Sequence, residues 1–177
     1  MNRRSTIKLL AAGGLVTASG SGYRWLVRER HHPELALGSV LERLGALEPD
    51  TIETNGAWGA ARTLDHLAQS VEFSMDGFPV ARSKLFRDTA GRLAFAVFQA
   101  RGRMTHGVEE AIPGEVVATD DRGTAAAHRR LVAALERFES HDGPLMPHFA
   151  YGELDKTRYA LAHAMHVHDH VAALAVA

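Results

Sequence analysis

An all-α fold is predicted by three features of the sequence. Residues that favour helices (Ala, Leu, Arg and Glu) are abundant, and only 6 of the 177 residues are proline. Apolar residues recur at helical spacing in several segments of the chain. The alternation of apolar and polar residues that is typical of strands nowhere persists beyond about four residues, apart from residues 115–119.

Five helical segments are expected, separated by loops that contain Gly or Pro. The third is interrupted by Gly91, so we expect one kinked helix or two short ones. An irregular stretch from about residue 105 to 121 connects the two halves of the protein. The segments span residues 33–47, 60–78, 83–104, 124–139 and 153–174, the fourth capped by Asp121 or Thr124 and the fifth begun by Glu153 or Asp155.

The second helix has one strongly acidic side. Asp65, Glu72 and Asp76 fall within about 40° of one another when the chain turns by about 100° per residue. We therefore expect these three carboxylates on the solvated face, with Leu67 and Val71 facing the core.

Composition excludes several classes of function. A formal net charge of −1 provides no basic field for nucleic acid. The chain has no cysteine, which removes disulfides, thiolate metal sites and cysteine nucleophiles together. Any metal ion must therefore be held by histidine and carboxylate. The content of 46% hydrophobic and 23% charged residues is typical of a globular domain.

The N-terminus has the pattern of an export signal. Arg3, Arg4 and Lys8 precede a short, mildly apolar run, which resembles a twin-arginine signal. We expect residues 1–30 to be a signal segment and linker, recognised by the twin-arginine export machinery, and residues 31–177 to be the helical domain. A periplasmic or otherwise extracytoplasmic location follows. The alternative is a loose basic N-terminal arm.

Histidines cluster in the last helical segment. Four of the 11 lie within residues 163–170. With His163 at 0° on a helix, His166 falls at about −60°, His170 at about −20° and His168 at about 140°. Three histidines therefore share one face, and His168 points elsewhere. His166 and His170 are four residues apart, a spacing that lets both bind one ion.

His66 is the candidate for a third ligand. It lies on the flank of the buried face of the second helix. A lone histidine in such a position is more commonly a core or boundary residue than a ligand. Combined with a pair on another helix, however, it would complete a three-histidine site with an open position, as in catalytic metal sites.

Two motifs carry a family resemblance. Leu64-Asp-His66-Leu-Ala-Gln-Ser70 and the closing His166-Val-His-Asp-His170 run resemble the DinB/YfiT-like superfamily of four-helix-bundle metalloenzymes. The segments Met75–Pro79, Phe98–Met104 and Pro147–Gly152 are most similar to a branch known only as a domain of unknown function. The resemblance covers about Pro33 to Leu174. It implies a four-helix bundle with a long irregular connection between its halves.

The resemblance also implies a metal site. One histidine of the second helix and two of the last bind a divalent ion in that superfamily, which corresponds here to His66, His166 and His170. Zinc is the first expectation, with nickel, iron or manganese as alternatives. His163 shares the face of His166 and can replace or join it. The superfamily also makes a homodimer formed through bundle helices an expectation.

Three functions are consistent with these residues. The first is a metal-dependent hydrolase, lyase or transferase that acts on a small molecule, in which the ion lowers the pKa of a bound nucleophile. His163 or His148 is then a candidate general base, and His168 or Asp169 a candidate orienting group. Packing or capping explains His148 and His163 at least as well. The second is a non-catalytic extracytoplasmic metal-binding or stress protein. The third is a purely structural bundle.

Overall fold

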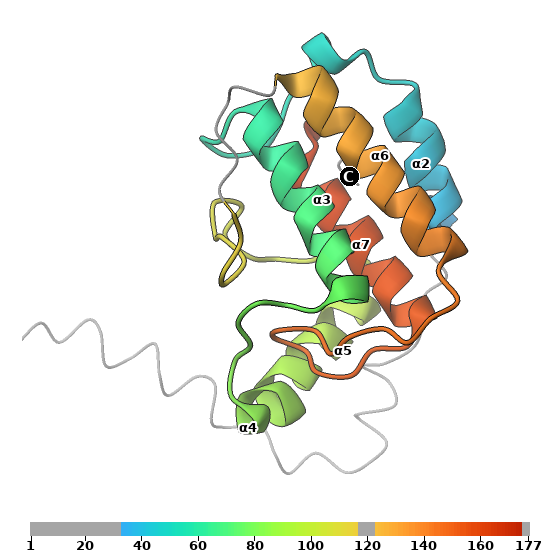
Figure 1. Cartoon of the computed structure of the whole chain (residues 1–177). Coiled ribbons are helices and arrows are strands. Elements are labelled where there is room, and N and C mark those ends of the chain that lie inside the picture. Colours follow the sequence, from blue (N-terminus) through green and yellow to red (C-terminus); the bar gives the residue numbers. More distant parts are fainter. Residues whose placement is uncertain (1–32, 117–122, 175–177) are drawn as a thin grey trace, which may run out of the picture.

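The computed structural model describes residues 33–116 and 123–174, and within these ranges the protein is helical without strands. Four helices lie side by side: α2 (Leu37–Gly45), α3 (Ala60–Asp76), α6 (Thr124–Ser140) and α7 (Lys156–His170) (Figure 1). Helix α3 packs on α6 and α7, and α2 packs on the same two helices. The all-α prediction is confirmed. The expected signal segment, residues 1–30, lies outside the described residues.

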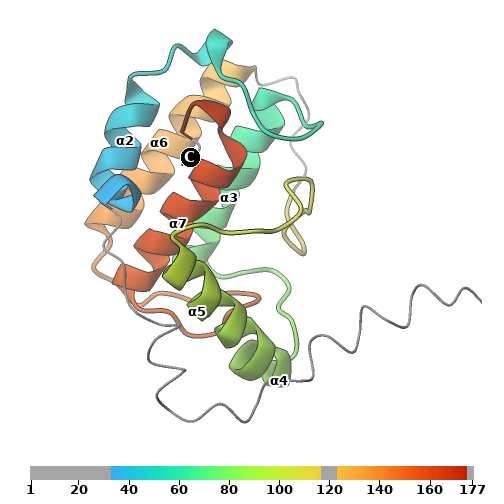
Figure 2. The same cartoon turned by 180° about the vertical axis from the view of Figure 1, so that it is seen from behind.

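A shorter helical arm crosses one end of the four helices (Figure 2). It consists of α4 (Lys84–Phe86), the π-helical turn η3 (Arg87–Gly91) and α5 (Arg92–Arg101). The expected interruption at Gly91 is thus a π-helical turn. A Cβ atom at Gly91 would lie 1.9 Å from the carbonyl oxygen of Ala150, so glycine lets the arm approach the loop between α6 and α7.

The core lies between the four long helices. Its fully buried side chains come from every one of them, as the spacing of apolar residues predicts. The largest are Val40 and Leu44 of α2, Leu64, Leu67 and Val71 of α3, Leu131, Leu135 and Phe138 of α6, and Tyr159 and Met165 of α7.

The expectation for the acidic side of α3 is wrong in part. Asp65 is only 1% exposed, because this side of α3 packs against α6. Arg130 of α6 donates from Nη1 to Asp65 Oδ1 at 3.0 Å, and from Nε and Nη2 to the two carboxylate oxygens of Glu72 at 3.0 and 2.7 Å. These carboxylates join two helices, and only Asp76, 53% exposed in its pair with Arg137, lies on the solvated face.

Local signals fix the ends of the helices. Gly77, with φ of 108°, ends α3 two residues before Pro79. Asp155 caps α7, and its Oδ1 accepts a hydrogen bond from the Arg158 amide. Gly123 precedes α6, so Thr124 is its first residue and not its cap; Asp121 lies outside the described residues.

None of the helices in the described ranges has the length and apolar character needed to cross a membrane.

The short 3-10 turns are η1 (Pro33–Leu35), η2 (Pro49–Thr51) and η5 (Ala172–Leu174). The loop after η2 is tied to the end of α7. The backbone amide of Asn55 donates to the His170 carbonyl at 2.8 Å, and the backbone amide of Ala172 donates to the Glu53 carbonyl at 3.0 Å. These bonds hold the C-terminal turn of α7 beside the start of α3.

Candidate metal centre

Three histidines converge where α3 and α7 lie side by side. His66 comes from α3, and His166 and His170 come from successive turns of α7. One nitrogen of each imidazole lies within 4.8 Å of the others, and all three residues are buried. The structure therefore brings together the three residues that the sequence indicates, and they can form a metal site.

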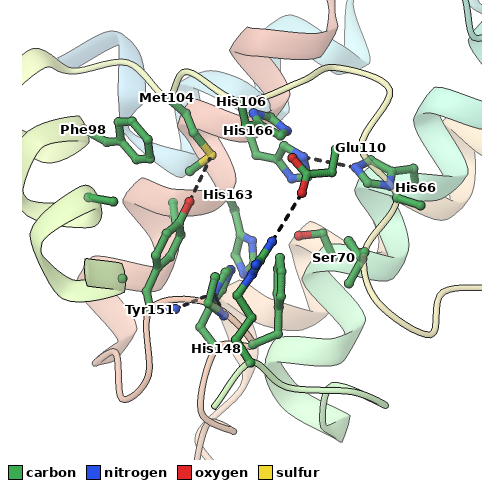
Figure 3. A pocket seen from close by; sticks show the side chains of 18 of the residues that line it. His66, Ser70, Phe98, Met104, His106, Glu110, His148, Tyr151, His163 and His166 are labelled. Carbon is green, nitrogen blue, oxygen red and sulfur yellow. Dashed lines mark hydrogen bonds and ion pairs between the residues drawn. The ribbon is translucent and has the colours of Figure 1, made fainter. Parts of the chain in front are cut away.

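Glu115 fixes the orientation of His66. The Oε2 atom of Glu115 lies 2.7 Å from Nδ1 of His66 and also accepts a hydrogen bond from the Ile112 amide at 2.9 Å. A proton on Nδ1 leaves the lone pair of His66 on Nε2, which lies 3.2 Å from Nε2 of His166 (Figure 3). A carboxylate behind a histidine is the usual partner of a metal-binding imidazole.

The carboxyl of Glu115 stays ionised. Burial by itself raises the pKa of this group, but the hydrogen bonds from His66 and from the Ile112 amide outweigh burial and lower the pKa below the ordinary value. An ionised carboxylate is the stronger acceptor for His66.

The two α7 histidines are neutral. Burial lowers the pKa of His166 well below its ordinary value, with the neighbouring His66 adding to the effect. Burial likewise lowers the pKa of His170 to about 3. Neutral imidazoles offer the lone pairs that metal binding requires. Together with a nitrogen of His66, they place three imidazole nitrogens on two packed helices where a metal ion can be held.

A cavity of about 250 Å³ opens beside this cluster, with His66 and His166 in its wall (Figure 3). Arg82 and Glu110, whose side chains are paired at 3.4 Å and largely exposed, also line it. The loop between α6 and α7 contributes Phe149 and Tyr151. The other apolar walls are formed by Phe86, Ala94, Phe98, Met104, Ile112, Ala150 and Ala162.

His148 and His163 line the same cavity, but both are held by hydrogen bonds within the protein. Nδ1 of His148 accepts from the amides of Ala150 and Tyr151. Nε2 of His163 lies 3.2 Å from Oγ of Ser74. Burial lowers the pKa of each histidine to about 3, so both are neutral and weak bases.

His168 lies away from the three-histidine cluster, as the helical phase predicts. It is buried and lines a separate hollow with Asn55, Met165 and Asp169. Burial lowers its pKa, and the nearby charge of Arg43 adds to this effect. It is therefore not placed to orient His66 or His166.

His106 lies beside the three-histidine cluster, and sequence analysis did not identify it. Its ring centre lies 5.1 Å from those of His166 and His170. It comes from the irregular stretch after α5, where no helical period relates one residue to another. Asp169, the proposed orienting group, lies beside it, with Oδ2 at 2.9 Å from Nδ1 of His106.

Residues 29–176 match the family model described as "Protein of unknown function (DUF1569)". Because the match covers most of the chain, this protein belongs to that family. No curated protein and no solved structure shows a significant match to the chain. The sequence similarity accordingly supplies a family without an assigned activity.

Proposed function

We propose that this member of the DUF1569 family is a metal-dependent enzyme that acts on a small molecule through a three-histidine site. The observation that carries the proposal is the convergence of His66, His166 and His170 within 4.8 Å, with the first two of them in the wall of a mainly apolar cavity. Three protein ligands leave a position for water or substrate, which is the arrangement of catalytic zinc sites. The cavity gives that position a place where a substrate can bind.

The residues of this chain have separate tasks in such a site. When bound, a divalent ion lowers the pKa of a coordinated water and so supplies a nucleophile at neutral pH. The carboxylate of Glu115 orients the His66 imidazole at 2.7 Å. The aromatic and aliphatic walls would bury the apolar part of a bound substrate.

The cavity indicates the class of substrate. Its walls are mainly aromatic and aliphatic side chains, while its nitrogen ligands lie together at one place. We therefore expect a small, largely apolar molecule with one polar, metal-binding group. Hydrolysis or lyase chemistry suits an exported protein better than transfer to a low-molecular-weight thiol, because such thiols are mainly cytoplasmic.

The superfamily and the cellular location are part of the proposal. Helices α2, α3, α6 and α7, with the arm and irregular stretch between α3 and α6, are compatible with a DinB/YfiT-like four-helix bundle. Residues 1–30 would direct export by the twin-arginine route. Fusion of these residues to a reporter should carry it out of the cytoplasm, and a reporter that stays inside would contradict this.

The metal content of the purified protein tests the proposed site. We expect about one divalent ion per chain in the natural protein, little in the double variant His166→Ala/His170→Ala, and unchanged content in His141→Ala, which alters a histidine outside the cluster. Natural protein that binds no metal ion would contradict the proposal and favour a structural bundle. A metal-loaded protein inert toward esters, amides and thiol adducts would favour the second candidate, a non-catalytic metal-binding protein.

A further inference from the structure

We propose that His106 is a fourth ligand of the metal centre, contributed by the irregular stretch between α5 and Glu115. This inference rests on the proposed function, because it assumes that His66, His166 and His170 bind a divalent ion. It adds a residue that neither the helical spacing nor the family match indicates.

The distances match those of a shared ion. Nε2 of His106 lies 3.2 Å from Nε2 of His170, and Nε2 of His66 lies 3.2 Å from Nε2 of His166. Two nitrogens bound to one zinc ion at 2.0–2.1 Å lie about 3.3–3.4 Å apart in a tetrahedral site. The rings thus form two pairs, each at the spacing of neighbouring ligands.

The two pairs also face each other. The ring centre of His166 lies 5.1 Å from that of His66 and 5.1 Å from that of His106. His106 is outside the group in which every pair of ligand atoms lies within 4.8 Å. Metal binding therefore requires a small movement of His106 toward His66, which a residue outside any helix can make.

Asp169 lies behind His106, on the side where Glu115 lies behind His66: next to Nδ1 of the ring. Oδ2 of Asp169 lies 2.9 Å from Nδ1 of His106, and the two side chains are only 24% and 21% exposed. The two atoms lie at ion-pair distance without the geometry of a hydrogen bond, and a small rotation of the His106 ring would let Nδ1 donate to this carboxylate while Nε2 faces His170. The backbone of Asp169 is itself anchored, because its carbonyl accepts a hydrogen bond from the Asn55 side chain at 2.7 Å.

The fourth ligand would occupy the position left open by the other three. His66, His166 and His170 are on packed helices, whereas His106 is on a loop and also lines the cavity. His106 is therefore the ligand that an entering substrate can replace without moving a packed helix. Without substrate, four imidazoles would surround the ion. A substrate that replaces His106 would open one position.

Titration with Co²⁺ tests this assignment, because its visible absorption depends on the number and kind of ligands. We compare the natural protein, His106→Gln and the control His141→Gln. We expect one cobalt ion per chain in all three. In His106→Gln the affinity should fall by about 10- to 100-fold and the spectrum should change, since water replaces an imidazole. Asp169→Asn should weaken binding less, with the spectrum nearly preserved.

The outcomes separate the two proposals. Cobalt bound by His106→Gln with the affinity and spectrum of the natural protein would overturn the fourth ligand and leave the three-histidine site intact. A natural protein that binds no cobalt would overturn the three-histidine site as well. His106 lies outside the helical core, so its replacement by Gln should leave the far-ultraviolet circular dichroism unchanged.

Discussion

Glu115 links the irregular stretch after α5 to the three-histidine cluster. Its side chain is 4% exposed although it comes from an irregular segment. It accepts hydrogen bonds from both His66 and the Ile112 amide, so it holds the imidazole and its own loop together. A carboxylate in this position stabilises the tautomer of His66 that has its lone pair on Nε2.

Replacement of Glu115 by Ala should therefore weaken metal binding by about 10- to 100-fold, because His66 loses its orienting acceptor. Glu115→Gln should have a smaller effect, since the amide oxygen still accepts from Nδ1 but lacks the charge. Competition titrations with a chromogenic chelator measure these affinities. Glu136→Ala is the matched control, as Glu136 is exposed on α6 and lines no part of the cavity. Equal affinities for Glu115→Ala and the natural protein would contradict the orienting role.

At the scale of the elements, an ionic link joins α3 to α6. Arg130 binds Glu72 through two hydrogen bonds and Asp65 through a third. Asp65 is buried, and its Oδ2 has no hydrogen-bond partner among the described residues, so its charge depends on Arg130. The hydrogen bonds that Arg130 donates to Glu72 and Asp65 raise its pKa, which burial alone would lower.

Arg130→Ala should lower the free energy of unfolding by about 2–3 kcal/mol, because it leaves Asp65 charged and unpaired inside the protein. The effect stays below that of a fully buried pair, since the Arg130 side chain is 31% exposed. Arg137→Ala removes the exposed pair with Asp76 on the same two helices and should cost less than about 1 kcal/mol. Denaturation by urea measures both, and similar losses for the two variants would contradict the buried link.

At the scale of the whole molecule, burial of histidines makes stability depend on pH. His148 and His163 are inside the protein with pKa values near 3, whereas an unfolded histidine titrates near about 6.5. Below pH 6.5 the unfolded state therefore binds protons that the folded state does not. Stability is fully present above about pH 6.5 and is lost as the pH falls toward 3.

Over most of that window, each such histidine lowers the free energy of unfolding by about 1.4 kcal/mol for every unit by which the pH falls. Replacement of His163 by Gln removes one of them, so the loss of unfolding free energy between pH 6 and 5 should shrink by about 1 kcal/mol in metal-free protein. His141→Gln, outside this buried group, should leave the slope as in the natural protein. Chemical denaturation across the pH range measures it, and an unchanged slope for His163→Gln would contradict the buried neutral state.

Local sequence signals predicted much of the fold and part of the site. The apolar periods and the Gly and Pro residues placed the helices to within a few residues, because both act on the backbone nearby. The same regularity put His166 and His170 on one face of α7 and His168 on another, since a helix relates residues four apart without help from the rest of the chain. That these residues bind metal stays a prediction.

Tertiary structure decided the remaining parts. His106 and Glu115 come from an irregular stretch, where no period relates spacing to direction, so only the folded chain brings them to the cluster. Asp65 looked solvated because its helix was considered alone, and packing of α6 buried it against Arg130. Periodicity shows which face of a helix a residue occupies. What covers that face depends on contacts between segments far apart in the chain.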